Sequence, residues 1–496
     1  MSRILRWVSA LVLGVMVGGC AITTLHPADQ AKLDQRLPPS VRVGDRTLLV
    51  EQPVEAVAGV ITQEGRLHVF AIDSTKVIHH IEVDGENVIA REQLGTFEDG
   101  FWRAALEAIE WPPGTLRVLA GRLQFVRVRG EAWRTLEGNR CVSFVVAKER
   151  LFCAFIASGE EFGTPTRLDV HVGIVFWIPL ILPMQVQSRK LVIAEAMGEA
   201  WIVRAVVDAH DALSATDLVI GADVNGNFHA FYTAAKGGSG FIVMPLEVRG
   251  QGPVPELRYV RLSAGKLSAT LPNREAKAPK DVYALPEGAR LRYPSFVLVG
   301  SEGLLMPLHM RFAVDPTSGA IEGLIGLNVF NARLSGYKEN FWFKDGGLID
   351  VRLYDWQWSD PVEVALLGRW PEEDVSYQAG GLAPYFDRFP GPLLHFDANG
   401  TLHAVVRHCV GCVTWGGEAR AGLSYLEKNS SGWLRPVKLD ADNPRRLAGP
   451  IVGNGKVYIV WSEQDRYGRD RGLFGRWIWS EKDPSLLKQG SESSFR

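Results

Sequence analysis

Two cysteines near the end of the sequence have a spacing that can support chemistry. Cys409 and Cys412 form a Cys-x-x-Cys pair, and His403 and His408 precede it closely. Thiolates and imidazoles suit zinc, and a Cys-x-x-Cys pair at the N-terminus of a helix can be redox active. Here the pair follows a strand-like segment, and no helix signal comes after it. We therefore expect a structural disulfide between Cys409 and Cys412; zinc binding by these four residues and redox activity are the alternatives.

The first 20 residues have the order of features that marks a targeting segment. Arginines at positions 3 and 6 precede an apolar run that ends in Val17-Gly18-Gly19-Cys20. This order resembles the signal peptide of a bacterial lipoprotein. The resemblance implies cleavage after residue 19, diacylglycerol and a fatty acyl group such as palmitate on Cys20, and, because Ala21 follows, transfer to the outer membrane. The alternative is a secretory signal peptide with an incidental cysteine.

A lipid on Cys20 leaves four of the five cysteines, an even number, in an oxidising compartment. Two disulfides are the simplest arrangement. Cys141 and Cys153 lie on opposite arms of one predicted hairpin around residues 147–150. We therefore expect Cys141 to pair with Cys153, and Cys409 to pair with Cys412.

The composition is that of a globular protein. Hydrophobic residues make up 46% of the 496 residues, and 54 basic against 56 acidic side chains give a formal net charge of -2. A chain without a basic excess cannot neutralise a phosphate backbone, which argues against nucleic acid as a partner. The 51 Gly and 27 Pro residues indicate many turns.

Four segments follow one another along the chain. We predict a signal peptide (residues 1–19), a polar tether broken by prolines (20–45), a folded body (46–482) and a polar C-terminal tail (483–496). The body consists mainly of short β-branched and aromatic runs separated by Gly, Asp and Asn, which is typical of strands and turns. Phe101–Ile109 is its best candidate for a short helix.

One hairpin pattern recurs in the body: an apolar strand, a polar turn that contains Gly or a charge, and an alternating strand. Repetition of such hairpins around a closed ring buries their apolar faces and leaves no free edge, which is the physical basis of a β-propeller. We therefore predict an all-β protein, a β-propeller of six or seven blades, with tandem β-sandwiches as the alternative. The copies are residues 59–71, 145–155, 219–232, 296–306, 312–324, 394–406 and 451–461.

Two segments resemble parts of sialidase-like propellers. Arg292, followed by Tyr-Pro-Ser-Phe, is similar to the arginine segment that binds a substrate carboxylate in sialidases, and Ser424–Trp433 resembles an Asp-box that has lost its aspartate. The resemblance implies that Arg292 binds a carboxylate through charge-assisted hydrogen bonds, beside a Tyr–Glu nucleophile and an acidic proton donor. The alternative is that Arg292 packs its stem on the sheet.

Two tryptophan pairs have the spacing of residues that share one face of a strand: Trp356 with Trp358, and Trp477 with Trp479. Such pairs can bind sugar rings by stacking, or they can seal the space between neighbouring sheets. We expect the packing role and retain the four as possible binding aromatics.

Val172–Met184 is the most apolar internal stretch. It contains two prolines and is too short to cross a bilayer as a helix. We expect a buried strand pair bent at Pro179. A loop that dips into the membrane is the alternative.

These features predict the location of the protein in the cell better than they predict an activity. We expect a lipid-anchored protein of the bacterial cell envelope, held at the outer membrane and facing the periplasm or the surface. Its propeller would present a binding or scaffolding surface to another protein or a glycan, without a cofactor and without catalysis. The competing hypothesis is a sialidase-like glycan hydrolase that uses Arg292.

Overall fold

The computed structural model describes residues 36–97, 106–137, 140–163, 167–175, 178–186, 189–208, 219–236, 254–263, 298–299, 304–333, 340–354, 357–358, 362–369, 393–410, 420–442, 444–465 and 469–480. Within these ranges the chain forms strands and one 3-10 turn, η1 (Gly159–Phe162). No helix there is long and apolar enough to cross a membrane. The prediction of an all-β protein is confirmed.

The described strands form seven sheets, called blades 1 to 7 below, and one separate two-stranded hairpin. Blade 1 consists of β3 (Val54–Ile61), β4 (Leu67–Asp73), β5 (Val77–Asp84) and β6 (Asn87–Thr96). Blade 2 consists of β7 (Leu106–Glu110), β8 (Thr115–Ala120), β9 (Leu123–Val128) and β10 (Arg134–Leu136). Blade 3 consists of β11 (Ser143–Ala147), β12 (Arg150–Ser158), β15 (Arg189–Met197) and β16 (Ala200–Asp208), and blade 4 of β17 (Val219–Ala222), β18 (Asn227–Lys236) and β19 (Val254–Ser263).

Blade 5 is the largest sheet, with β20 (Leu298–Val299), β21 (Leu304–Val314), β22 (Ile321–Arg333), β23 (Asn340–Tyr354), β24 (Gln357–Trp358) and β25 (Val362–Arg369). Blade 6 consists of β26 (Leu393–Phe396), β27 (Leu402–Val410), β28 (Arg420–Asn429), β29 (Gly432–Trp433) and β30 (Val437–Leu439). Blade 7 combines β31 (Pro444–Gly453), β32 (Lys456–Gln464) and β33 (Asp470–Ser480) with the N-terminal strands β1 (Val41–Val43) and β2 (Thr47–Val50). The separate hairpin is β13 (Arg167–Val175) and β14 (Ile178–Val186).

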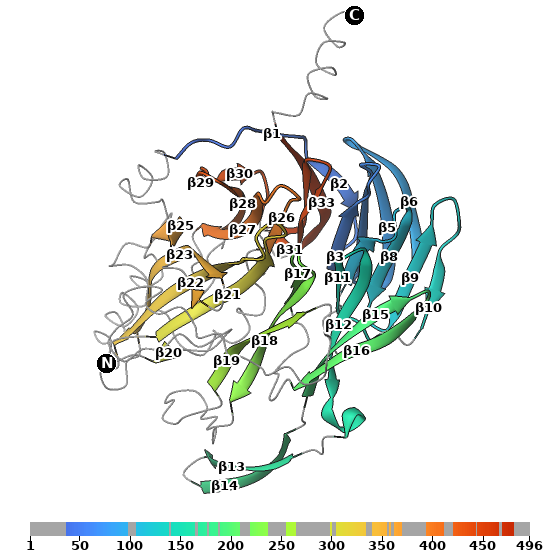
Figure 1. The fold of residues 1–496 in the computed structure, drawn as a ribbon. Coiled ribbons are helices and arrows are strands. Elements are labelled where there is room, and N and C mark those ends of the chain that lie inside the picture. Colours follow the sequence, from blue (N-terminus) through green and yellow to red (C-terminus); the bar gives the residue numbers. More distant parts are fainter. Residues whose placement is uncertain are drawn as a thin grey trace, which may run out of the picture.

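The seven blades follow one another around a ring. Their inner strands contact each other in the order β3, β7, β11, β17, β21, β26, β31 and back to β3; Figure 1 shows several of them around the middle of the molecule. The hydrophobic clusters lie between successive blades. Phe70 of blade 1 shares one with Phe125 of blade 2, and Phe152 of blade 3 packs edge-on against Phe228 of blade 4. Sheets packed face to face around a closed ring define a β-propeller, and its seven blades fall within the predicted six or seven.

The two ends of the described chain close the ring. β1 and β2 pair antiparallel with β33, with Val41 opposite Ser480 and Leu48 opposite Phe474. The propeller therefore begins at Val41, within the segment that the sequence assigns to the tether.

The turn between the first two long strands of a blade has a recurrent geometry. In blades 1, 4, 5 and 6 its glycine has φ between +70° and +84° (Gly65, Gly226, Gly319 and Gly400), a conformation that glycine adopts without strain. The third residue after the turn glycine is buried in six blades, although it is a large polar or aromatic residue. These residues are His68, Arg117, His229, Glu322, His403 and Tyr458.

These turns account for most of the repeat seen in the sequence. The copies at 59–71, 145–155, 219–232, 394–406 and 451–461 are the inner hairpins of blades 1, 3, 4, 6 and 7. The copies at 296–306 and 312–324 both belong to blade 5, as β20–β21 and β21–β22.

The helix expected at Phe101–Ile109 is wrong over the part that the structure describes. Leu106–Glu110 is strand β7, which pairs antiparallel with β8 from Leu106 opposite Ala120. Leu106 and Ala108 pack toward blade 1, whereas Ile109 packs toward blade 3. An inner strand has a neighbouring blade on both faces, and this tertiary packing overrides the local helical pattern.

Val172–Met184 lies in the β13–β14 hairpin, an insertion between β12 and β15 of blade 3. The expected pair of strands is present, but its turn is not at Pro179, and the predicted burial of its side chains lies outside what the structure describes. Pro179 lies within β14, opposite Ile174, and the strands are connected through residues 176–177, which are outside the described ranges. Both strands are edges, where proline is tolerated because an edge N–H has no ladder partner to lose.

Cys141 and Cys153 form a disulfide with Cα atoms 5.6 Å apart, which confirms the predicted pair. Both cysteines are buried in the hydrophobic cluster between blades 2 and 3. The bridge fastens the segment before β11 to the neighbouring strand β12.

Candidate functional site

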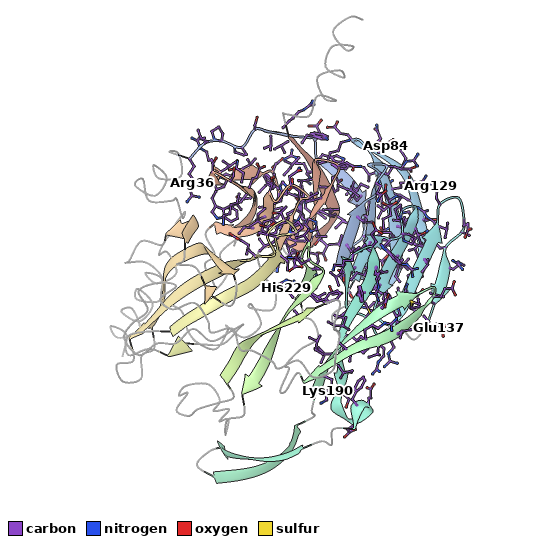
Figure 2. The ribbon with its side chains drawn as sticks, viewed as in Figure 1. Arg36, Asp84, Arg129, Glu137, Lys190 and His229 are labelled. Carbon is purple, nitrogen blue, oxygen red and sulfur yellow. A yellow bond between two sulfur atoms is a disulfide. The ribbon has the colours of Figure 1, made fainter. Side chains whose placement is uncertain are left out.

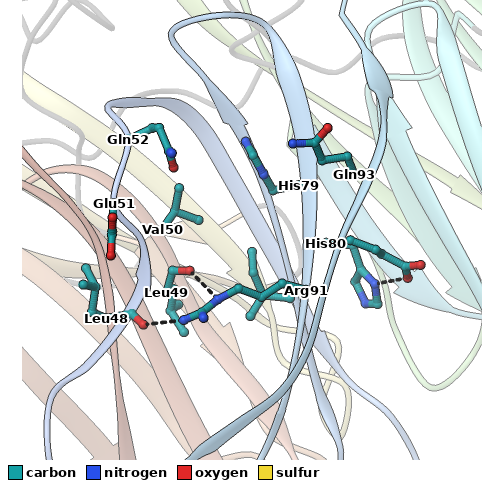
Figure 3. Close-up of a pocket in the computed structure, with 11 residues that line it drawn as sticks. Leu48, Leu49, Val50, Glu51, Gln52, His79, His80, Arg91 and Gln93 are labelled. Atoms are coloured by element: carbon teal, nitrogen blue, oxygen red, sulfur yellow. Dashed lines mark hydrogen bonds and ion pairs between the residues drawn. The ribbon is translucent and has the colours of Figure 1, made fainter.

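A groove lies between blade 7 and blade 1 (Figure 3). Its volume is about 350 Å³, within the size range of small-molecule sites. β2 and the two residues after it line one side, and β5 and β6 line the other. The polar residues of the lining include Glu51, Gln52, His79, Arg91 and Gln93.

The alternation of β5 determines which of its residues face blade 7 across the groove, although His80 also belongs to the lining. Ile81 is buried together with Leu49 and Val50, on the face toward blade 7. His80 stacks on Phe70, on the face toward blade 2. Because successive residues of a strand face opposite sides, His79 lies on the same side as Ile81, toward the groove.

Asp73 holds the imidazole of His79 in place. Its Oδ2 lies 2.7 Å from His79 Nε2, while Oδ1 accepts hydrogen bonds from Thr75 and from the backbone N–H of Val77. Burial opposes ionisation of Asp73, but the hydrogen bonds from His79, Thr75 and Val77 outweigh it and lower the pKa of this carboxyl. An ionised Asp73 accepts from Nε2–H, so Nδ1 is the acceptor nitrogen of the neutral ring.

Arg91 closes the backbone edge of β2 along the groove. Its Nε donates to the carbonyl of Leu49 at 3.3 Å, and its Nη2 donates to the carbonyl of Leu48 at 3.2 Å (Figure 3). On its other side β2 pairs with β33. These two carbonyls of β2 therefore already have a donor.

Behind the groove, a chain of polar groups joins blades 1 and 2. His68 Nδ1 lies 2.9 Å from His80 Nε2, and His80 Nδ1 lies 2.6 Å from Glu92 Oε1. The same carboxylate oxygen accepts from Trp133 Nε1 at 2.7 Å and from Arg127 at 3.1 Å. Three donors from two blades thus converge on Glu92, which also lines the groove.

The protonation states along this chain follow from burial. Desolvation lowers the pKa of His68 to about 3 and also lowers the pKa of His80. For Glu92, burial raises the pKa, but the hydrogen bonds from Trp133 and His80 and the charge of Arg127 outweigh it, so the pKa is lowered. Neutral imidazoles therefore carry the polar chain inward from an ionised carboxylate at the surface.

Glu107 is a second unusual carboxyl, on inner strand β7. Its Oε2 accepts from the backbone N–H of Phe144 at 2.9 Å, and its Oε1 lies 3.3 Å from the Ser143 hydroxyl. The residue is partly exposed to solvent, yet protein atoms surround its carboxyl group, and this burial raises the pKa of Glu107 to about 8. Such perturbed carboxyls are frequent at functional sites, although no described cavity adjoins this one.

His403 takes part in a buried hydrogen-bond chain in blade 6. Its Nδ1 lies 2.7 Å from the Tyr425 hydroxyl, which in turn donates to Glu427 at 3.0 Å, and its Nε2 lies 3.7 Å from Asp397. Among the described residues, no group of three His, Cys, Asp or Glu is arranged to hold a metal ion. The described surroundings of His403 are therefore those of a core histidine.

Tyr425 and Glu427 have the residue types of a sialidase nucleophile but not its exposure. Tyr425 is fully buried, and burial raises its pKa. Burial and a raised pKa disfavour the tyrosinate form that attack on a substrate requires. The Asp-box-like segment lies on the β28–β29 hairpin, where Trp433 is buried in the cluster between blades 5 and 6.

The C-terminal tryptophan pair is part of the core. Trp477 and Trp479 are only 2% and 7% exposed, and their rings stack with centroids 6.3 Å apart. Trp477 also packs edge-on against Tyr458 in the cluster that joins blades 7 and 1. This burial favours the packing role that the sequence predicts for the pair.

For the other predicted site residues, the structure describes either no position or no side chain. Cys20, Arg292, Trp356 and Cys412 are outside the described ranges, as are the side chains of Trp358, His408 and Cys409.

Sequence reasoning missed the groove, but one signal pointed toward Asp73 and His79. A turn aspartate is followed six positions later by histidine at 73/79, 223/229 and 397/403, with N–O distances of 2.7, 3.3 and 3.7 Å. Figure 2 shows His229 of the second pair toward the middle of the ring. The recurrence marks a repeated turn motif of the fold, and of these six residues His79 lines the groove.

No family model and no curated protein matches the sequence. Among solved structures, the chain is similar to an α-L-arabinanase of Penicillium chrysogenum (TM-score 0.38, 9% identity, 89% of this chain and 99% of that one). It is also similar to an α-L-arabinofuranosidase of Fusarium graminearum (TM-score 0.36, 8% identity, 88% and 97%) and to AofleA of Arthrobotrys oligospora (TM-score 0.35, 11% identity, 82% and 94%). Likenesses this weak carry no conclusion about activity.

Proposed function

We propose that this protein is a lipid-anchored binding protein of the bacterial cell envelope, and that its propeller binds a glycan in the groove between blades 7 and 1. The observation that carries the proposal is the lining of the groove. A carboxylate (Glu51), two amides (Gln52 and Gln93), an oriented imidazole (His79) and a guanidinium (Arg91) meet there beside aliphatic side chains. Sugar hydroxyls both donate and accept, so they suit a surface that offers both functions.

A glycan is a better candidate than an extended peptide at this site. A peptide that adds a strand to a sheet needs free backbone groups along the edge it joins. Arg91 already donates to the carbonyls of Leu48 and Leu49, so this part of the β2 edge is occupied. The remaining hydrogen-bonding capacity is in side chains, which favours a ligand with hydroxyl groups over a strand.

The groove is tested with a pair of matched double variants. Glu51 and Gln52 are exposed at the groove, whereas Gln63 and Glu64 are exposed in the turn between β3 and β4, outside the lining. Binding to an array of bacterial glycans, followed by titration with the best ligand, compares Glu51→Ala/Gln52→Ala with Gln63→Ala/Glu64→Ala. We expect the groove variant to bind about tenfold more weakly and the control to bind like the wild type. Equal binding by both variants, or no glycan bound by the wild type, would overturn the proposal.

The anchor is tested separately. With a lipid on Cys20, the wild-type protein should incorporate labelled palmitate, and Cys20→Ala should not. Equal palmitate incorporation by Cys20→Ala and the wild type, or none by the wild type, would contradict the anchor and leave the groove proposal as it stands.

A further inference from the structure

The β13–β14 hairpin stands apart from the propeller. Its two strands pair with each other and with no other described strand. Figure 1 shows it projecting from blade 3, away from the seven sheets. Isolated two-stranded hairpins are marginally stable in water, so a hairpin of this kind needs a surface that covers it.

The register of the hairpin separates an apolar end from a polar end. The pairs next to the connection consist of apolar residues and glycine on both faces, because successive pairs alternate between the faces. Residues 172–175 and 178–181 are called the apolar tip below. Its pairs are Val172–Ile181, Gly173–Leu180, Ile174–Pro179 and Val175–Ile178. Polar residues occur only nearer the propeller, at Arg167, Asp169, His171 and Gln185.

A membrane is the surface that fits the apolar tip. A groove on a partner protein typically covers one face of a strand pair, whereas the apolar tip offers apolar residues on both faces. Its four-residue arms are about 14 Å long at about 3.4 Å per residue, far less than the roughly 30 Å hydrocarbon core of a bilayer. The apolar tip can therefore enter one leaflet but cannot span the membrane.

The edge of β14 is also compatible with shallow insertion. Unpaired backbone N–H groups are costly in hydrocarbon, and proline has none. Pro179 lies in the apolar tip and Pro183 lies two pairs behind it, opposite Val170. Pro179 therefore removes an N–H from the part that inserts, and Pro183 removes one from the segment just behind it.

We propose that the apolar tip of the β13–β14 hairpin inserts into the interfacial region of a lipid bilayer and forms a second membrane contact, independent of any lipid on Cys20. The hairpin belongs to blade 3, and the N-terminal strands belong to blade 7, three blades away around the ring. Two separated contacts would fix which side of the propeller faces the membrane. A tether alone would leave the propeller free to rotate.

The test uses the whole chain without its lipid, as Cys20→Ala, and vesicles of phosphatidylethanolamine and phosphatidylglycerol. We expect this protein to sediment with the vesicles at low and at high salt, because burial of apolar residues is not screened by ions. Ile174→Asp/Leu180→Asp should reduce the bound fraction about tenfold, because a charge in the apolar tip opposes insertion. Leu168→Asp/Val186→Asp, at the polar end of the same hairpin, serves as the matched control and should bind like its parent.

Thermal unfolding of each variant distinguishes insertion from a packing role. Because the hairpin pairs with no blade, the tip variant should unfold at the same temperature as its parent. A large drop in its melting temperature would mean that the tip packs in the core and would overturn the proposal. The absence of vesicle binding by the parent, equal binding by the tip and control variants, or binding that high salt abolishes would also overturn it. None of these results bears on the groove.

Discussion

His80 stacks on His68 between blades 1 and 2, with ring centroids 5.2 Å apart and an interplanar angle of 13°. His80 donates from Nδ1 to Glu92, so its Nε2 accepts, and His68 must supply the proton from its own Nδ1. This order requires His80 to be neutral, and burial keeps His68 neutral as well by lowering its pKa to about 3. A proton added to the pair would put a charge in a buried site near Arg127.

Acid should destabilise the protein through this pair. In the unfolded chain both rings take up a proton near pH 6.5, whereas burial lowers their pKa in the folded chain, for His68 to about 3. The stability that depends on neutral rings is therefore present above pH 6.5 and declines as the pH falls below it. Urea unfolding at pH 7.5 and pH 5 should show a smaller loss for His68→Gln/His80→Gln than for the wild type. Parallel losses would show that the pair does not titrate in this way.

Glu107→Gln should stabilise the protein at alkaline pH. The pKa of Glu107 is raised to about 8 when folded, against about 4.5 when unfolded, so its contribution is full below pH 4.5 and is lost as the pH rises through 8. Glutamine keeps the acceptor for Phe144 N–H and has no charge to desolvate. Unfolding at pH 8.5 should require a few kcal/mol more for the variant, with little difference at pH 4.5. Glu110→Gln, on the same strand, should not stabilise, because Glu110 accepts from the backbone N–H groups of Gln63 and Gly114.

Loss of the Cys141–Cys153 disulfide should weaken the protein. The bridge closes a loop with a sequence separation of 12 residues, and bridges of this size typically contribute about 2–4 kcal/mol. Cys141→Ala/Cys153→Ala should show that loss in chemical unfolding. Mass spectrometry after alkylation, without reduction, should find both thiols unmodified in the wild type. Alkylation of either cysteine in the unreduced, denatured protein would contradict the pairing.

Trp477→Ala should affect stability and leave ligand binding intact. Its ring is almost fully buried against Tyr458, and truncation of a buried tryptophan typically costs about 3–5 kcal/mol. Leu48→Ala, at a residue that is 39% exposed, should cost much less. The glycan affinity of Trp477→Ala, measured well below its melting temperature, should match that of the wild type. A weaker glycan affinity with unchanged stability would restore the binding role to Trp477.

The sequence predicted the parts of the fold that rest on local signals. Glycine turns such as Gly65 and Gly400 need only a few neighbouring residues to be recognised, and the predicted hairpins around them are present. The sequence did not predict blade 2, because β7 forms a strand only through its packing against the blades on either side. The Trp477 pair could equally have faced a ligand, since spacing assigns a face of a strand and does not say what covers that face.

The groove was harder to predict, because sheet pairing and ring closure assemble it. Arg91 reaches β2 from 42 residues away in the sequence. His79 and Gln93 are brought together as a cross-strand pair of β5 and β6. Nothing in the local sequence around Glu51 indicates that these residues face it.

The pairing of β1 and β2 with β33 also constrains the order of events in the making of the protein. Val41 can pair with Ser480 only after Ser480 has been synthesised. Blade 7, and with it the closed propeller, is therefore completed only at the end of synthesis. If the chain is exported through a translocon, its N-terminus arrives first and its partner strand arrives last. Until then the blades between them form an open row, in which the first and the last blade each lack one neighbour. A truncated or stalled product would thus present open sheet edges to its neighbours, and the cell would recognise it as a substrate for chaperones and proteases.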